Sequence, residues 1–253
     1  MKQRKEVHWF RPDGKKIYGE LYLPETDVPG PYPLVVFCHE LLHTGRTGRY
    51  YAEKLAAEGF AMLLFDFCGG AYNSRSDGSI MDMSVMTEAA DLEAVLEEIC
   101  RSPEIDAGHI TLMGGSQGAV VATVVATRHP EWFDALIALY PPYSIPEDTR
   151  AQFPDKEAIP EICPYTDWFT GGRCYGADVW DYDVFEEMKK FTKPVLLLHG
   201  TEDELVPETL SERAAECFPD AELHLIPGGH HIFSGECRRI AGEIIIDFVR
   251  RHR

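Results

Sequence analysis

The sequence predicts an α/β fold in which a mostly parallel central sheet is covered by helices on both faces. Short apolar runs rich in β-branched residues alternate with amphipathic helical stretches along the chain, which is typical of this class. The runs are apolar throughout instead of alternating with polar residues, as expected of strands buried on both faces. The length of 253 residues and the apolar fraction of 45% suit one domain with a sizeable core, spanning residues 1–253.

The expected elements follow in order from the N-terminus. A hairpin comes first, because Val7–Phe10 and Ile17–Leu23 are joined by a turn that contains Pro-Asp-Gly. Six further strands are expected at Leu34–Cys38, Ala61–Phe65, Ile110–Met113, Ala135–Leu139, Val195–Leu198 and Glu222–Ile226. Helices are expected between them at Arg49–Glu58, Met86–Cys100, Ala119–Thr127, Glu208–Cys217 and Cys237–Arg251.

The stretch Met86–Cys100 has a clear helical pattern. Ala89, Leu92, Val95 and Leu96 recur at helical spacing and predict a buried face. The acidic residues of this stretch are expected on the other face of the helix.

One interval, at about 141–191, contains no clear strand. Prolines, aromatic residues and acids crowd it, as in YPPYSIPEDTRAQF and CPYTDWFTGGRCYG. A structureless loop of this length would be unusual. We therefore interpret the interval as a cap inserted into the domain, over the carboxyl edge of the sheet.

Composition narrows the classes of partner. The formal net charge of -18 disfavours binding to nucleic acid, because such a surface repels phosphate backbones. No apolar run reaches the roughly 18 residues that a membrane helix needs, and the N-terminal stretch has charges without the apolar core of a secretory signal. The seven cysteines are odd in number and show no CxxC spacing, as expected of reduced thiols. These observations predict a cytoplasmic protein with no nucleic-acid or membrane partner.

A candidate nucleophile stands in GGSQG at 114–118. This is the pattern G-x-S-x-G, and it lies between an expected strand and an expected helix. A serine on such a strand–turn–helix bend is exposed for attack, and the following helix N-terminus favours negative charge beside it. Ser116 is therefore the candidate nucleophile. A serine hydroxyl needs a base and an acid that orients the base, and here both are expected later in the chain.

The acid and the base are expected in two later loops. Three acids, Glu202, Asp203 and Glu204, follow the expected strand VLLLHG, at the end of a strand where side chains enter active sites. We choose Asp203, with its two neighbours as competitors. The base is expected in the glycine turn of IPGGHHIF, where His230 and His231 are not separated by the pattern itself.

Four segments together carry a resemblance to a known family. FDFCGG, MGGSQG, LLLHGTEDELVP and IPGGHHIFS resemble, in this order, the feruloyl and cinnamoyl esterase branch of the α/β-hydrolase superfamily. The resemblance covers essentially the whole chain and is weakest in the cap. It implies the α/β-hydrolase fold, and no cofactor is expected. In that branch the acid lies in H-G-x-x-D-x-x-V, which falls on Asp203. The base lies in H-x-F, which falls on His231, so the resemblance favours His231 over His230.

An oxyanion hole needs two backbone N–H donors. Gln117, directly after the nucleophile, is expected to supply one. In similar esterases the other donor comes from a turn that reads H-G-F or H-G-x-x-x-T-G, and this chain has HELLHTG at 39–45, which makes Leu41 the second donor. Glu40 stands where glycine is usual, so we expect a negative charge near this corner of the site.

The same HELLH segment matches H-E-x-x-H, a zinc metalloprotease signature. That motif works on a helix, where the two histidines share a face. Here an expected strand precedes it and Thr-Gly follows it, so convergence of His39 and His43 on a metal is not expected. A zinc hydrolase remains the weaker alternative, and no metal is expected.

These features together predict a serine carboxylesterase that acts on small esters through a Ser–His–Asp triad and an acyl-enzyme. The resemblance extends the expectation to hydroxycinnamoyl esters, because similar esterases bind a phenolic ring in the cap with an acid and a tyrosine at its hydroxyl. Tyr175 and Asp148 match these two groups, and Trp168 and Tyr143 are further candidates for lining the pocket. Simple packing of the cap is the alternative for each of them.

Alternatives of other classes stay open at this point. The same fold also serves serine peptidases, thioesterases and lactonases. An inert α/β-hydrolase scaffold used for binding is a further candidate, which the set of Ser116, Asp203 and His231 argues against. The partner expected is a small-molecule ester, and the resemblance also raises a homodimer, because capped esterases of this kind often pair.

Overall fold

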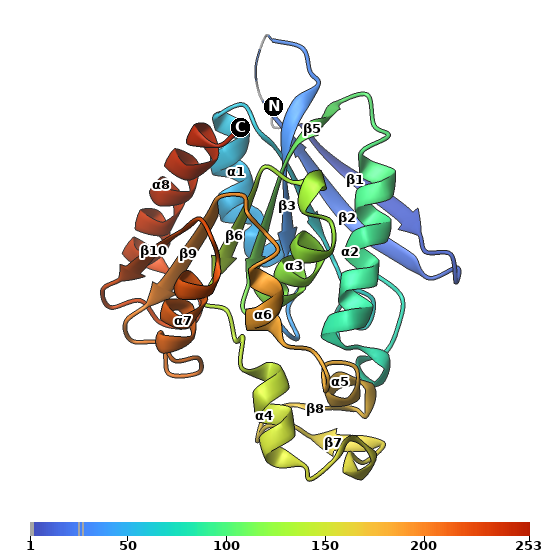
Figure 1. Ribbon diagram of the computed structural model, residues 1–253. Coiled ribbons are helices and arrows are strands. Elements are labelled where there is room, and N and C mark those ends of the chain that lie inside the picture. The colour runs from blue at the N-terminus through green and yellow to red at the C-terminus, as the bar shows by residue number, and fades with distance from the viewer. Residues whose placement is uncertain (1–2, 25, 27) are drawn as a thin grey trace.

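An eight-stranded sheet runs through the middle of the protein, between two layers of helices (Figure 1). The computed structural model describes residues 3–24, 26 and 28–253. The strands of this sheet are β1 (Gln3–Phe10), β2 (Lys16–Leu23), β3 (Tyr32–Cys38), β4 (Ala61–Phe65), β5 (Ile105–Gly115), β6 (Ala135–Leu139), β9 (Val195–Gly200) and β10 (Ala221–Ile226). Their order is β1-β2-β4-β3-β5-β6-β9-β10. The pairs β1–β2 and β2–β4 are antiparallel, and all the other pairs are parallel.

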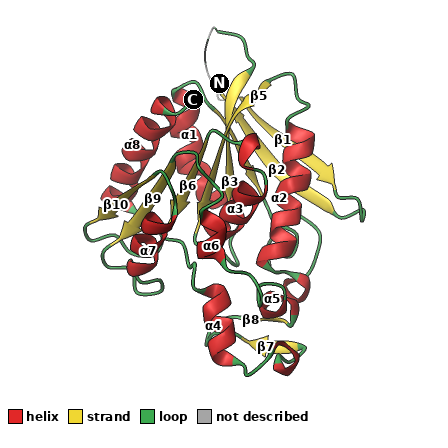
Figure 2. Cartoon of the chain, viewed as in Figure 1, coloured by secondary structure: helices red, strands yellow, loops and turns green. Residues whose placement is uncertain are grey.

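The helices divide between the two faces of the sheet (Figure 2). Helices α1 (Arg49–Ala57) and α8 (Gly235–Arg251) pack together on one face. Helices α2 (Val85–Ile99), α3 (Gln117–Arg128), α6 (Val184–Met188) and α7 (Thr209–Cys217) form a continuous layer on the other. Single turns of 3₁₀ helix occur at Gly45–Gly48, Ile80–Asp82, Pro130–Trp132 and Lys156–Ala158.

Burial explains why the apolar runs become strands. Every residue of β4, β6 and β9 is buried, because helices cover both sides of these central strands. One core lies between the sheet and the layer of α2 and α3, and a second lies between the sheet and the layer of α1 and α8. All the strands predicted from apolar runs are present, and the predicted α/β-hydrolase fold is confirmed.

The segment between β6 and β9 builds a small structure of its own. It contains α4 (Ile145–Gln152), α5 (Cys174–Ala177) and a two-stranded antiparallel sheet of β7 (Ile162–Pro164) and β8 (Thr170–Gly172). These elements lie beyond the carboxyl ends of the central strands (Figure 1). The last element of the predicted cap interval, α6, instead packs against α3 and α7 on the face of the sheet.

Two expectations about local structure are wrong. The strands β7 and β8 were not expected, because three-residue strands carry too little apolar periodicity to be recognised. The acids of α2 do not all face solvent, because Glu88 and Asp91 are buried. They lie four residues before Leu92 and Val95 respectively, and this spacing places them on the apolar side of the helix.

Among the residues that the structure describes, no helix combines the length and the apolar character that crossing a lipid bilayer requires.

Candidate active site

Ser116 occupies a sharp bend between β5 and α3. Its backbone is in the left-handed region, with φ 49° and ψ -125°, which is a strained conformation for a residue with a side chain. Its N–H donates to the carbonyl oxygen of Leu139 on β6 at 2.9 Å, which ties the bend to the sheet. The bend thus presents the serine side chain at the carboxyl edge of the sheet, at the start of a helix.

The glycines around Ser116 are required by close backbone contacts. A Cβ on Gly114 would lie 2.3 Å from the carbonyl oxygen of Gly118, and a Cβ on Gly118 would lie 2.2 Å from that of Cys38. No side chain fits at either distance, so the G-x-S-x-G pattern reflects the packing of α3 against β3 and β5.

Two later loops bring an imidazole and a carboxylate to the serine. His231 Nε2 lies 2.9 Å from Ser116 Oγ, and His231 Nδ1 lies 2.8 Å from Asp203 Oδ2. The loop after β9 carries Asp203, and the loop after β10 carries His231. The structure therefore joins the three residues predicted from the sequence in one hydrogen-bonded chain.

Asp203 is held by more than the histidine. Its side chain is 1% exposed, and its Oδ1 accepts the backbone N–H groups of Leu205 and Val206, both at 2.9 Å. His199 Nε2 lies 3.3 Å from Asp203 Oδ2, and burial lowers the pKa of His199. These contacts fix the carboxylate in the orientation that His231 requires.

His230, the competing base, turns the other way. Its Nδ1 lies 2.7 Å from Glu204 Oε1, and its side chain is exposed. The hydrogen bond with this carboxylate raises the pKa of His230. The structure thus separates the two adjacent histidines, which the glycine turn alone did not.

The two backbone donors expected for an oxyanion hole lie beside Ser116. Leu41 and Gln117 both line the pocket that contains Ser116. Neither backbone N–H has a hydrogen-bond partner within residues 3–24, 26 and 28–253. Leu42, directly after Leu41, has a positive φ of 61°, and its N–H donates to the carbonyl oxygen of Gly70 at 3.0 Å. The turn after β3 is thereby fixed with the Leu41 amide free to donate.

Glu40 lies at this corner of the site, as expected, and is one of the residues that line the pocket. Its Oε1 accepts from the Tyr140 hydroxyl at 3.0 Å and its Oε2 from the Thr47 hydroxyl at 2.7 Å. A Cβ on Gly115 would lie 2.5 Å from Glu40 Oε1, so the carboxylate lies behind the serine bend. The Tyr140 ring also contacts the His231 ring, with 5.0 Å between centroids. Glu40 and Tyr140 together support the bend and the imidazole from behind.

The HELLH segment lies at the end of β3 and in the following turn, not on a helix. His39 is buried, and both of its ring nitrogens are used by the backbone. Nδ1 lies 2.8 Å from the carbonyl oxygen of Glu40, and Nε2 lies 3.0 Å from the N–H of Phe67. Burial lowers the pKa of His39 and keeps the ring neutral. His39 has no nitrogen left for a metal, so His39 and His43 do not form the histidine pair of a zinc metalloprotease.

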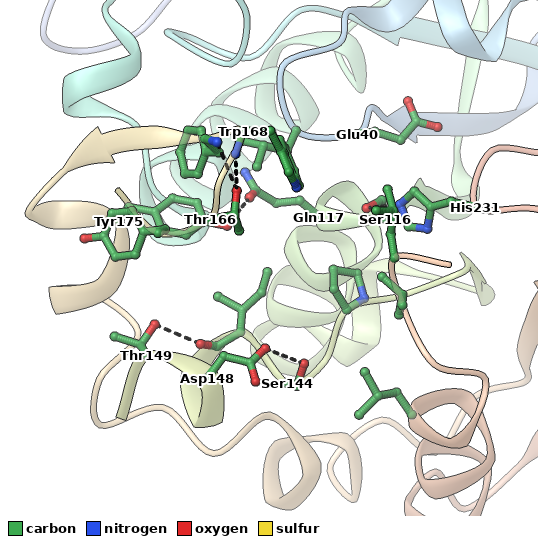
Figure 3. Close-up of a pocket in the computed structure, with 18 of the residues that line it drawn as sticks. Glu40, Ser116, Gln117, Ser144, Asp148, Thr149, Thr166, Trp168, Tyr175 and His231 are labelled. Carbon is green, nitrogen blue, oxygen red and sulfur yellow. Dashed lines mark hydrogen bonds between the residues drawn. The ribbon is translucent and has the colours of Figure 1, made fainter. Parts of the chain in front are cut away.

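A pocket of about 540 Å³ opens between the serine and the segment beyond the sheet edge (Figure 3). Ser116 and His231 lie at one end of it, and Tyr175 and Asp148 lie further along (Figure 3). Apolar and aromatic side chains form most of the wall: Leu41, Pro142, Ile145, Tyr165, Trp168, Phe169, Leu205, Val206, Pro207, Leu210 and Ile232. Neither lysine nor arginine occurs among the lining residues, whereas Glu40 and Asp148 do, so the pocket disfavours anionic groups.

Three of the four predicted cap residues line this pocket, namely Tyr175, Asp148 and Trp168. The Tyr175 hydroxyl donates to Gln117 Oε1 at 2.9 Å, and Asp148 Oδ2 accepts from the Ser144 hydroxyl at 2.7 Å. The prediction for Tyr143 is wrong. Its side chain is 0% exposed, packs in the main core, and forms a 2.8 Å hydrogen bond with Thr123 on α3.

Sequence reasoning missed Glu88, which is buried directly behind Gln117. Gln117 Nε2 donates to Glu88 Oε2 at 2.8 Å. Burial raises the pKa of Glu88 to about 8. The signal that could have found it is its position on the apolar face of α2, four residues before Leu92.

Comparisons with known proteins identify the family of the chain and its fold. Residues 48–252 match the sequence model of the prolyl oligopeptidase family. The chain belongs to the prolyl oligopeptidase family. An uncharacterized protein of Mycobacterium tuberculosis is 27% identical over 240 residues, which cover 94% of this chain and 75% of that protein. The human acylamino-acid-releasing enzyme, another relative, is 25% identical over 184 residues, which cover 69% of this chain and 24% of the enzyme.

Solved structures extend the likeness to the whole chain. The structure of Est1E from Butyrivibrio proteoclasticus with ferulic acid bound has a TM-score of 0.87 and 25% identity, and the match covers 97% of this chain and 98% of that one. The α/β-hydrolase GrgF from Penicillium sp. sh18 has a TM-score of 0.80 at 17% identity, which shows the shared fold over 99% of both chains. This member of the prolyl oligopeptidase family is thus a serine hydrolase of the α/β-hydrolase fold, resembling the feruloyl esterase branch.

Proposed function

We propose that the protein hydrolyses carboxylic esters, with Ser116 as nucleophile, His231 as general base and Asp203 as the residue that orients the base. The observation that carries this proposal is the continuous chain of hydrogen bonds from Asp203 through His231 to Ser116. Ser116 and His231 lie at one end of a pocket of about 540 Å³, which gives a small acyl substrate access to the serine.

In the proposed mechanism, Ser116 Oγ attacks the carbonyl carbon of the ester while His231 Nε2 accepts the hydroxyl proton. The N–H groups of Leu41 and Gln117 donate to the oxygen that becomes negatively charged. His231 then passes the proton to the departing alcohol, which leaves an acyl group on Ser116. A water molecule, deprotonated by the same imidazole, attacks this acyl group and releases the acid.

For the substrate we propose an aromatic acyl group that bears a hydroxyl, as in hydroxycinnamoyl esters. The pocket wall offers aromatic side chains, including Tyr165, Phe169 and Trp168. The Asp148 carboxylate is an acceptor, and the Tyr175 oxygen can accept a hydrogen bond because its own proton goes to Gln117. Both groups suit a phenolic O–H donor. The ferulic acid in the related Est1E structure supports the same substrate class.

A second candidate is hydrolysis of acylated amino acids or peptides. The family match and the human acylamino-acid-releasing enzyme favour it. The chain spans about a quarter of that enzyme's length, so this activity is the alternative against which the ester hypothesis is tested.

The test compares three substrate types on the purified protein: methyl p-coumarate, methyl cinnamate, which differs from it only by lacking the phenolic hydroxyl, and an acetyl-alanine anilide. We expect kcat/KM for methyl p-coumarate to exceed that for methyl cinnamate about tenfold, since a hydrogen bond to a charged acceptor contributes roughly 1.5 kcal/mol. The variant Asp148→Asn should remove most of this difference. Faster cleavage of the anilide than of either ester would overturn the ester proposal in favour of the peptidase.

A fluorophosphonate probe provides the matched control for the nucleophile. The native protein should be labelled, and Ser116→Ala should be neither labelled nor active. An unlabelled native protein would indicate an inert scaffold, and full activity in Ser116→Ala would refute the proposed mechanism.

A further inference from the structure

A buried series of polar side chains leads away from the reaction centre. The Tyr175 hydroxyl donates to Gln117 Oε1 at 2.9 Å, and Gln117 Nε2 donates to Glu88 Oε2 at 2.8 Å. Glu88 lies in the first turn of α2 and is 1% exposed. In Figure 3, Gln117 lies between Ser116 and the part of the pocket that holds Tyr175. Glu88 thus reaches the site through the residue that directly follows the nucleophile.

Among the described residues, the Gln117 amide is the only hydrogen-bond donor to Glu88, and no cationic side chain is paired with it. Its Oε1 is buried and has no hydrogen-bond partner in the described part of the chain. Asp91, one turn along α2, acts on Glu88 as a like charge, and its own partner is Arg11 at 2.6 Å. Burial therefore raises the pKa of Glu88 to about 8, so that the group is neutral at pH 7.

Cys38, His39 and Tyr175 approach Glu88 from other elements, and burial keeps each of them uncharged. Cys38, at the end of β3, is a buried thiol whose pKa is raised by burial and then by Glu88. A Cβ on Gly70 would lie 3.0 Å from His39 Cε1 and 3.2 Å from Glu88 Oε1, so these two side chains lie close together, and burial lowers the pKa of this histidine. Tyr175, on α5, is a buried phenol whose pKa is raised by burial and then by Glu88. With a proton on Glu88 Oε1, Glu88 carries no charge beside these three neutral groups, and the nearby charge of Asp91 is paired with Arg11.

We propose that Glu88 is a positioning residue that holds Gln117 in the oxyanion hole, and that it must be uncharged for the reaction to run at its full rate. This inference rests on the proposed function, because it needs the Gln117 N–H to donate to a developing oxyanion. One oxygen of neutral Glu88 accepts a hydrogen bond from the Gln117 side-chain amide, and the other oxygen of Glu88 carries the proton. Loss of that proton places a negative charge behind the same residue that stabilises the oxyanion. Two like charges about 10 Å apart at an effective dielectric constant of about 20 repel strongly enough to slow a reaction about tenfold.

The decisive experiment is the pH dependence of kcat from pH 6 to pH 10 for the native protein and for Glu88→Gln. Glutamine keeps an acceptor for Gln117 but has no proton to lose. We expect kcat of the native protein at pH 9.5 to be about one tenth of its value at pH 7, and the ratio for Glu88→Gln to stay near one. Glu97→Gln, an exposed position on the same helix, serves as the matched control and should keep the native profile.

A third variant, Glu88→Leu, tests the positioning role. Leucine removes the acceptor, so the Gln117 side chain loses its anchor, and kcat at pH 7 should fall about tenfold below that of Glu88→Gln. The concentration of competent sites is measured by fluorophosphonate titration, which corrects for misfolded protein. Equal kcat in the leucine and glutamine variants would overturn the positioning role.

The outcomes separate this inference from the proposed function. If esters are hydrolysed and Ser116→Ala is inactive, but the native protein and Glu88→Gln share one alkaline profile, only the role of Glu88 is refuted. If the protein neither hydrolyses esters nor reacts with the probe, the proposed function itself is refuted, and the inference falls with it.

Discussion

The side chains of Asp203 and Glu88 are both almost completely buried, and each connects to the reaction centre through one other side chain. Asp203 does so through His231 and Glu88 through Gln117. Asp203 receives two backbone N–H groups on one oxygen and an imidazole on the other. Glu88 receives one amide donor, and its second oxygen has no partner among the described residues. The number of donors, and not the degree of burial, distinguishes the two acids.

This difference bears on the protonation state of Glu88. A buried carboxyl with few donors is stabilised in its neutral form. The charged acid is needed beside His231, whose imidazolium it stabilises during the reaction. The neutral acid is suited to the position behind Gln117, where a charge would oppose the oxyanion.

The largest expected effect comes from removing the charge at Asp203. In Asp203→Asn the amide cannot stabilise a protonated His231, and kcat with p-nitrophenyl butyrate should fall about 10⁴-fold, as observed for this change in Ser–His–Asp enzymes. Glu204→Gln, one residue further along the same loop, is the control and should stay within about threefold of the native rate. Activity of Asp203→Asn within tenfold of native would show that another acid orients the base.

The next largest effect is on the free energy of unfolding and comes from the protonation of Glu88. Its folded pKa of about 8 lies above its ordinary value of 4.5, so between these pH values the folded chain retains a proton that the unfolded chain loses. The free energy of unfolding should therefore decrease as the pH rises from about 4.5 to 8, by at most about 1.4 kcal/mol per pH unit from this group. Urea unfolding at pH 5, 6, 7 and 8 should show a shallower decrease for Glu88→Gln than for Glu97→Gln. Parallel curves for the two variants would contradict the neutral state of Glu88.

The smallest effect is expected at His230, which carries the other hydrogen bond between a histidine and an acid in these loops. Its ring is exposed and points to Glu204, away from Ser116, so His230→Gln should change kcat/KM less than about twofold. His231→Gln, the adjacent position, should reduce it at least about 10³-fold. A loss of more than tenfold in His230→Gln would mean that the two histidines exchange roles in solution.

The parts of the fold that depend on residues close together in the sequence were predictable from the sequence. Continuous apolar runs such as Ala61–Phe65 and Ala135–Leu139 coincide with strands residue for residue, because burial on both faces requires apolar residues throughout. Ser116 was identified for a similar reason, since the packing of Gly114 and Gly118 against backbone leaves no alternative to glycine. Asp203 was chosen by its place at the end of β9.

The remaining parts depend on contacts between distant residues. The local pattern left His230 and His231 open, and only the resemblance favoured His231. The contacts that separate the two come from Glu204 and Asp203, which lie 26 and 28 residues earlier in the chain. Tyr143 is an aromatic residue in the cap interval, which made it a candidate for lining the pocket. Its side chain instead lies in the core, where it forms a hydrogen bond with Thr123 on α3. Glu88 is acidic, and an acid is assigned to the surface unless its buried partner is known.

The close approach of Gly118 to the carbonyl oxygen of Cys38 has a consequence for how this enzyme can diversify. The nucleophile bend and the turn after β3 form one rigid block, in which the smallest added side chain would collide with main chain. New specificity is therefore expected to arise by exchange of side chains on α4, α5 and the β7–β8 hairpin. Changes there alter the pocket wall and leave the positions of the reacting groups unchanged.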